Sequence, residues 1–156
     1  MAESVKGARL APFVKQGIFD AAMQFKDAGL IAASAAAQVG GAAKVVDLGT
    51  GLFRGCMILD VSEIEVATGD EKYTICVQLS NTTAFPDDSN SLTAAQIEMG
   101  AATPLLLGAV TTTGRYKLYF DNEFDGAFYR YARVYTVVAG TIATGINYSA
   151  WAVPMK

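Results

Sequence analysis

The pattern that most constrains the fold is a strict alternation of side chains between residues 72 and 80. Every second residue there is large and apolar: Tyr73, Ile75, Val77 and Leu79. An extended chain places these side chains on one face, and burying each of them contributes about 1.5–3 kcal/mol. A shift of one residue in the pairing of this segment would expose all of them. The segment therefore predicts a β-strand with one face in a core and a strongly specified register.

Similar segments, rich in aromatic and β-branched residues, recur along the chain and are separated by residues typical of turns. The predicted strands span residues 19–27, 44–48, 54–66, 92–99, 115–122, 130–139 and 146–154. A break in the alternation within residues 54–66 indicates a β-bulge. Short strands with a turn about every 8–12 residues are typical of a β-sandwich or a barrel, and the strand–helix alternation of an α/β fold is not seen.

The length of the chain indicates how many domains it forms, and its charge indicates which classes of partner it can bind. The 156 residues are the length of one domain. Charged residues make up 17% of the chain, against about 25% in typical globular domains. Either a large core or a surface covered by another protein explains this low fraction. The net charge of −3 argues against direct binding of nucleic acid, which requires a basic face.

The chain contains no histidine. This excludes Ser-His-Asp and Cys-His catalytic sites and removes the commonest general base and metal ligand. No other catalytic motif is seen, so we expect a protein that is not an enzyme and has no cofactor. Glu63 and Glu65 share one face of a predicted strand, which we expect to be solvated. Cys56 and Cys76 are expected to be buried thiols, with a cross-strand disulfide as the alternative.

Residues 1–17 have the composition of an N-terminal arm rather than of a strand. Charged residues such as Lys6 and Arg9 are spread among small ones, and Pro12 interrupts any helix. The arm is either a partly ordered tail or a segment that orders on a partner. We expect no signal peptide, and the longest uncharged run, residues 28–43, is short of the ~20 apolar residues that a membrane span needs.

Two segments resemble ligand-binding loops but lack part of the pattern. In DNEFDG, the side chains of Asp121, Glu123 and Asp125 alternate as in the first half of a calcium loop. The glutamate that closes such a loop would fall at Ala132, so a solvated hairpin is favoured. Residues 49–55, GTGLFRG, lack the ending of a phosphate-binding loop, and a tight turn is favoured. We therefore expect no metal site.

The tyrosines of the last third of the chain leave two interpretations open. The residues concerned are Tyr116, Tyr129, Tyr131 and Tyr148. They either pack in the core with their hydroxyls at its rim, or form an exposed aromatic patch that binds a protein or a sugar.

The order of the segments also carries a family resemblance. After the arm come FDAAMQFKDAGLIAASAA and KVVDLG, then ILDVSEIEVATGDEKYTICVQLSNTTAF, and finally GRYKLYF and VVAGTIATGINYSAWAV. Together, over residues 19–153, these passages resemble the cement proteins of tailed-bacteriophage heads, the Bordetella phage cement protein family. The arm before residue 19 and the DNEFDGAFYRY hairpin depart from the family pattern.

The resemblance implies an all-β, jelly-roll β-sandwich over residues 18–156, preceded by an arm of residues 1–17. It implies a structural protein on the outer surface of a virion capsid, where it clamps adjacent subunits of the major capsid protein. A homodimer is implied, with a trimer as the alternative. No membrane contact is expected. The alternative function is a carbohydrate-binding or adhesin jelly-roll module.

Contacts with a capsid would use exposed apolar side chains. We expect them on the arm and on the hairpin between residues 122 and 130. The candidate contact residues are Phe13, Val14, Ile18, Phe19, Phe124, Phe128 and Tyr129.

Overall fold

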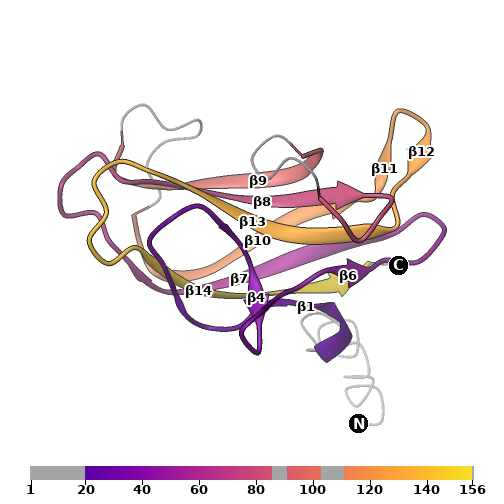
Figure 1. Ribbon diagram of the computed structural model, residues 1–156, viewed down its shortest axis with the longest axis horizontal. Coiled ribbons are helices and arrows are strands. Elements are labelled where there is room, and N and C mark those ends of the chain that lie inside the picture. Colours follow the sequence, from indigo (N-terminus) through magenta and orange to yellow (C-terminus); the bar gives the residue numbers. More distant parts are fainter. Residues whose placement is uncertain (1–19, 86–90, 103–110, 156) are drawn as a thin grey trace, which may run out of the picture.

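The computed structural model describes residues 20–85, 91–102 and 111–155. In this part of the chain two antiparallel β-sheets pack face to face as a β-sandwich (Figure 1). The predicted N-terminal arm lies outside the described residues, so the prediction made for it stays a prediction.

The first sheet has the strand order β1–β14–β7–β10, and β2 pairs with a further part of β14. Its strands are β1 (Gln24–Lys26), β2 (Leu30–Ile31), β7 (Arg54–Ile64), β10 (Gly114–Asp121) and β14 (Ile146–Pro154). The second sheet has the order β3–β13–β8–β9, and β6 pairs with a further part of β13. Its strands are β3 (Ala35–Ala36), β6 (Val46–Asp47), β8 (Lys72–Ser80), β9 (Thr93–Gly100) and β13 (Tyr131–Ala139).

From β6 onward the chain crosses between the two sheets at every step except the β8–β9 hairpin and the short hairpin before β13, and this strand order is that of a jelly roll. The predicted fold class, an all-β jelly-roll β-sandwich, is thereby confirmed. Two short hairpins and one helical turn complete the described structure. They are β4 (Gln38–Val39) with β5 (Ala42–Ala43), β11 (Glu123–Phe124) with β12 (Ala127–Phe128), and the 3₁₀ helix η2 (Ala21–Met23).

The core lies between the two sheets. The alternating apolar residues of β8 all point into it, and each is at most 4% exposed, as the sequence predicted. The facing sheet contributes Met57 and Leu59 from β7 and Tyr148 from β14, all fully buried. The hydroxyl groups of Tyr148 and Thr136 share a hydrogen bond of 2.7 Å inside the core. Burial raises the pKa of the Tyr148 hydroxyl.

The outer face of the second sheet is partly covered, which the alternation of β8 did not reveal. Gln78 points away from the core and is nevertheless fully buried. Its side-chain oxygen accepts a hydrogen bond from Arg133 Nε (2.8 Å). The Arg133 guanidinium lies 4.4 Å from the ring centre of Phe85 and 5.1 Å from that of Tyr135. The segment after β8 thus folds back over this face through Phe85.

Three predicted strands are shorter than expected. Of residues 44–48, only Val46–Asp47 form a strand, β6. Residues 54–66 contain the predicted bulge, because the pairing of β7 with β14 skips Ser62; the strand ends at Ile64. Of the predicted strand 19–27, the described residues 20–27 do not form one strand. The carboxylate of Asp20 accepts the N–H of Ala22 (2.9 Å) and caps η2, so that β1 begins only after it.

The two cysteines lie in different sheets, Cys56 in β7 and Cys76 in β8. Both are buried free thiols, as the sequence predicted, and the alternative of a disulfide is not observed. Burial raises the pKa of each thiol, which keeps both in the protonated, weakly nucleophilic form.

Candidate contact surface

The hairpin of β11 and β12 projects from one end of the sandwich (Figure 1). Its strands are joined by Asp125 and Gly126, whose φ angles are 52° and 77°. Two central residues with positive φ are typical of a type I′ turn, and Asp-Gly is a favoured pair there. The N–H of Gly126 also donates to Glu123 Oε1 (3.0 Å). The predicted hairpin is therefore confirmed, and its own sequence specifies the turn.

Asn122 holds the base of this hairpin against the loop before β7. Its side chain is fully buried and makes three hydrogen bonds. Oδ1 accepts from Phe53 N–H (2.7 Å), and Nδ2 donates to the carbonyls of Gly51 (2.9 Å) and Tyr129 (2.8 Å). The backbone of Asn122 bonds to Phe53 and Tyr129 as well. One buried amide thus fixes the direction in which the hairpin leaves the sandwich.

An ion pair supports the strand that follows the hairpin. Arg130 makes a bidentate contact with Asp47, with Nε–Oδ1 and Nη2–Oδ2 distances of 3.0 and 2.8 Å. The hydrogen bonds from Arg130 lower the pKa of the Asp47 carboxyl to about 2. Both side chains are about half exposed, so this ion pair contributes little to the free energy of unfolding and mainly orients the chain. Its bidentate form fixes the start of β13 beside β6.

Exposed apolar side chains gather at the end of the sandwich where this hairpin lies. Within the described residues, six large apolar side chains are exposed. Five of them belong to this end: Leu52, Tyr119, Phe124, Phe128 and Met155. They come from the loop before β7, the end of β10, the hairpin, and the chain after β14. We call this region the hairpin end; the sixth residue, Leu30, lies in β2 toward the opposite end.

The predicted contact residues fall in three groups. Phe124 and Phe128 are 53% and 47% exposed, as a contact surface requires. Tyr129 is only partly exposed and packs against the core. The arm residues Phe13, Val14, Ile18 and Phe19 lie outside the described residues.

Sequence reasoning missed other members of the hairpin end. Tyr119 falls in the predicted strand of residues 115–122, and no sequence signal marks it as exposed, although it is 63% exposed on the edge of the first sheet. Leu52 lies in a segment that was recognised only as a turn. No sequence signal marks Asn122 as buried, because an asparagine beside DG-type turn residues is equally typical of a solvated loop.

The four tyrosines considered as a binding platform do not come together. Tyr148 is fully buried, and Tyr116 and Tyr129 pack against the core. Tyr131 lies on β13, and its ring faces the guanidinium of Arg130 at 5.3 Å. Tyr116, Tyr129 and Tyr148 therefore agree with the first interpretation, in which the tyrosines pack in the core or at its rim.

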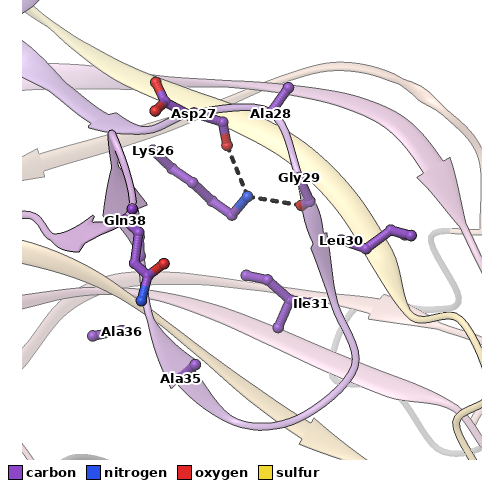
Figure 2. A pocket seen from close by; sticks show the side chains of 11 residues that line it. Lys26, Asp27, Ala28, Gly29, Leu30, Ile31, Ala35, Ala36 and Gln38 are labelled. Carbon is purple, nitrogen blue, oxygen red and sulfur yellow. Dashed lines mark hydrogen bonds between the residues drawn. The ribbon is translucent and has the colours of Figure 1, made fainter.

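A cavity of about 290 Å³ lies beside β1 and β2 (Figure 2). Lys26 points into it and is only 5% exposed. Its ammonium donates to the carbonyls of Asp27 (2.8 Å), Gly29 (2.9 Å) and Tyr148 (2.9 Å). Desolvation lowers the pKa of Lys26 to about 8, although the charge of Asp27 acts in the opposite direction.

An ammonium group has three N–H donors, and those of Lys26 match three carbonyl acceptors. A ligand in the cavity would therefore have to displace one of these carbonyls in order to bind the charge. The arrangement is that of a structural clamp, which fastens the segment after β1 onto β14.

Three carboxylates clamp the loops at the end of the sandwich opposite the hairpin. Glu65 accepts backbone N–H groups from Ala143, Thr144 and Gly145 at 2.7–3.1 Å. In the same region the carboxylates of Asp70 and Glu71 accept from hydroxyl and backbone donors of neighbouring loop residues. At Glu71 burial is the largest single influence and raises the pKa, but the hydrogen bonds together outweigh it and lower the pKa. At Glu65 and Asp70 the hydrogen bonds lower the pKa, against a smaller effect of burial.

The prediction for the Glu63–Glu65 pair is wrong in one respect. Glu63 is exposed on β7, but Glu65 lies beyond the end of that strand. Its carboxylate binds the loop between β13 and β14 instead of facing solvent. The difference arises because β7 ends at Ile64, so that the side-chain alternation of a strand no longer applies at Glu65.

Within residues 20–85, 91–102 and 111–155, no three cysteine or acidic side chains gather closely enough to hold a metal ion. The same residues contain no helix with the length and apolar character of a membrane span.

A scan against protein-family models finds no match to the chain, and a search of curated proteins finds none. The resemblance to phage cement proteins therefore rests on the sequence passages quoted above, and the function it implies stays a hypothesis.

Proposed function

We propose that the protein is a structural capsid cement protein, which binds the outer face of a phage head and clamps adjacent major capsid protein subunits. The hairpin end supports this proposal most directly. Its hairpin projects beyond the body of the sandwich (Figure 1). The two strands of this hairpin carry Phe124 and Phe128, whose side chains are about half exposed. Aromatic side chains held in this way are the usual anchors of protein–protein interfaces.

The way in which the hairpin is held also supports a binding role. A contact segment that is ordered before binding loses less conformational entropy when it meets its partner. Asn122 fixes the base of the hairpin, and Glu123 fixes its turn. The jelly roll itself supplies a rigid platform, because each sheet is covered by the other on its core face.

A carbohydrate-binding module is less well supported. Sugar binding by stacking requires aromatic rings exposed on one surface. Of the tyrosines considered for such a surface, one is fully buried and two pack against the core. The exposed aromatic side chains of the hairpin are phenylalanines, which lack a hydroxyl group for hydrogen bonding to a sugar.

The test uses heads of the encoding phage that lack this protein. Purified protein is added back, and its binding is measured by co-sedimentation with the heads. The double variant Phe124→Ala/Phe128→Ala should lose most of the binding. Removal of one aromatic side chain that anchors an interface typically costs about 2 kcal/mol or more, which is about a thirtyfold loss in affinity for each substitution. Leu30→Ala removes an equally exposed apolar side chain from another surface and should bind like the natural protein.

Head stability provides the second measurement. Heads with the protein bound should release their DNA at a higher temperature than bare heads, because ligand binding stabilises the bound form. If the protein does not co-sediment with the heads, or if bare heads are as heat-resistant as decorated ones, the proposed function is wrong.

A further inference from the structure

The first sheet carries a second apolar region, on its outer face next to the hairpin end. Residues that lie directly opposite each other on paired strands share one face of a sheet. Cys56 and Ile58 alternate with core residues of β7 and point outward, and so do the residues opposite them on β10 and β14. Cys56 is only 7% exposed and Ile58 only 5% exposed, although neither belongs to the core between the sheets. We call this region the sheet face; it consists of Cys56, Ile58, Lys117, Tyr119, Trp151 and Val153.

An arginine and a tryptophan are fixed against each other on this face. Arg115 donates from Nε and Nη2 to the carboxylate of Asp60, which lies opposite it on β7, at 2.6 and 2.7 Å. The same guanidinium reaches across β7 to Trp151 and lies 5.4 Å from the ring centre. Both side chains are therefore ordered before a partner binds, which lowers the entropy lost on binding.

The residue types of the sheet face are those that anchor protein interfaces. Tryptophan, tyrosine and arginine are the side chains most enriched at binding hot spots. Tyr119 is 63% exposed, and Trp151 and Val153 are partly exposed. The guanidinium over the Trp151 ring leaves less of that ring for a sugar to stack on, so a protein is the better fit. The outer face of the second sheet differs, because the protein's own Phe85 lies over it.

Polar residues border the sheet face on the side away from the hairpin. Asp60 and Ser149 form the next row of the sheet, and Glu63 beyond them is exposed. On the other side the sheet face is continuous with the hairpin end, because Tyr119 belongs to both. An apolar centre with a polar rim is typical of interfaces. Leu30 pairs with β14 beyond the polar border, so Leu30→Ala remains a control for contacts made here.

We propose that the sheet face is a second surface that binds the major capsid protein, through an apolar region that carries a carboxylate facing Lys117. This inference rests on the proposed function. Lys117 is exposed and lies opposite the apolar Ile58, so the residue across the strand does not neutralise its charge. A stable interface buries about 800 Å² and roughly 20–30 residues on each partner, which is more than the hairpin end alone supplies.

The two surfaces point in different directions. The hairpin continues past the end of the sandwich, whereas the sheet face lies along the outer side of the first sheet (Figure 1). A clamp on adjacent subunits needs two such surfaces. Two contacts made by one rigid unit also bind a repeating lattice more tightly than either contact alone.

The first test is co-sedimentation with heads that lack this protein. Lys117→Glu should weaken binding at least about tenfold, because it replaces an attraction by a repulsion. Arg115→Ala removes an anchor residue and should weaken binding about thirtyfold. Gln96→Glu adds a negative charge at an exposed residue on the outer face of the second sheet and should bind like the natural protein. Combining Lys117→Glu with Phe124→Ala/Phe128→Ala should multiply the two losses, because the sites are separate.

The outcomes separate this inference from the proposed function. If the natural protein does not bind heads, both are wrong. If it binds, and Lys117→Glu binds as tightly as Gln96→Glu, only the inference about the sheet face is overturned. Lys117→Glu decides the matter even where Arg115→Ala is poorly folded, because Lys117 is exposed and its replacement leaves the Arg115–Asp60 contact in place. Circular dichroism checks that each variant is folded.

The second test identifies the occupant of the sheet face. A carbodiimide condenses an amine with a neighbouring carboxylate to an amide, and mass spectrometry identifies the joined peptides. Decorated heads should contain Lys117 joined to a carboxylate of the major capsid protein. Lys117→Arg keeps the charge but has no amine, so binding should persist while this cross-link disappears. Cross-links from Lys117 to a second copy of this chain alone, or none to the capsid protein, overturn the proposal.

Discussion

Replacement of Asn122 by alanine tests whether one buried amide positions the candidate contact hairpin. The substitution removes hydrogen bonds to Phe53 N–H and to the carbonyls of Gly51 and Tyr129. Phe53 is buried, so its N–H would lose its partner without access to water, at about 1–3 kcal/mol. The carbonyls are nearer the surface, and each lost bond there costs about 0.5–1 kcal/mol.

The sum is a loss of about 2–5 kcal/mol in the free energy of unfolding. For a domain of this size, each kcal/mol lowers the melting temperature by about 2–4 °C, so we expect a decrease of about 4–20 °C. Thermal unfolding followed by circular dichroism measures it. Hydrogen exchange adds a local measurement, because amides at the base of the hairpin should exchange faster in the variant while those of β8 keep their relative protection.

Asn81→Ala is the matched control. Asn81 belongs to the loop that faces the same segment, but it is exposed, and from the described residues it accepts one long hydrogen bond, from Arg130 N–H at 3.4 Å. Its loss should change the free energy of unfolding by less than about 0.5 kcal/mol. If Asn122→Ala melts within about 2 °C of the natural protein, or no lower than Asn81→Ala, the reasoning about the hairpin base is refuted.

Three further predictions concern the rest of the fold. The carboxylates of Glu65, Asp70 and Glu71 have lowered pKa values in the folded state, so their stabilising contribution is present above the unfolded pKa of about 4 and is lost as the pH falls through the folded values. Melting temperatures should therefore fall in acid, and less steeply in Glu65→Gln. Gly145→Ala should destabilise by more than 1 kcal/mol, as chemical denaturation can measure, because φ is 98° there and the added Cβ would overlap the Ile31 carbonyl. The ammonium of Lys26 should titrate near pH 8 when followed by NMR of its side-chain carbons, and a value near 10.5 contradicts its burial.

The parts of the fold that the sequence predicted well are those in which one face of a strand is apolar. The alternation of Tyr73, Ile75, Val77 and Leu79 corresponds to four core side chains, because a pleated strand can bury them only together. The hairpin of residues 123–128 was also predicted, from a calcium-loop pattern that lacks its closing glutamate, and the structure shows that Asp125 and Gly126 form its turn.

Other features depend on contacts between distant segments and left no local signal. Gln78 looks like a solvent-facing residue of β8, yet Arg133 and the loop carrying Phe85 cover it. The role of Glu65 depends on a loop about 80 residues later in the chain. Asn122 reads as a turn residue in sequence, and only the loop at Gly51 makes it the centre of a buried network.

The candidate site was predicted in part. The hairpin and its exposed Phe124 and Phe128 were identified from sequence, because aromatic residues beside a tight turn have little core to enter. Leu52 and Met155 were not identified from sequence, since their position at the hairpin end follows from the arrangement of strands in the jelly roll. Tyr119 required knowledge of the sheet edge, which pairing alone reveals.

The measurement that tests the central claim most directly is an electron cryomicroscopy reconstruction of phage heads with this protein bound. The proposal predicts a jelly roll on the outer surface, with the hairpin of residues 123–128 in contact with the major capsid protein. Heads that carry no such density, or a bound jelly roll whose hairpin end points into solvent, would contradict it.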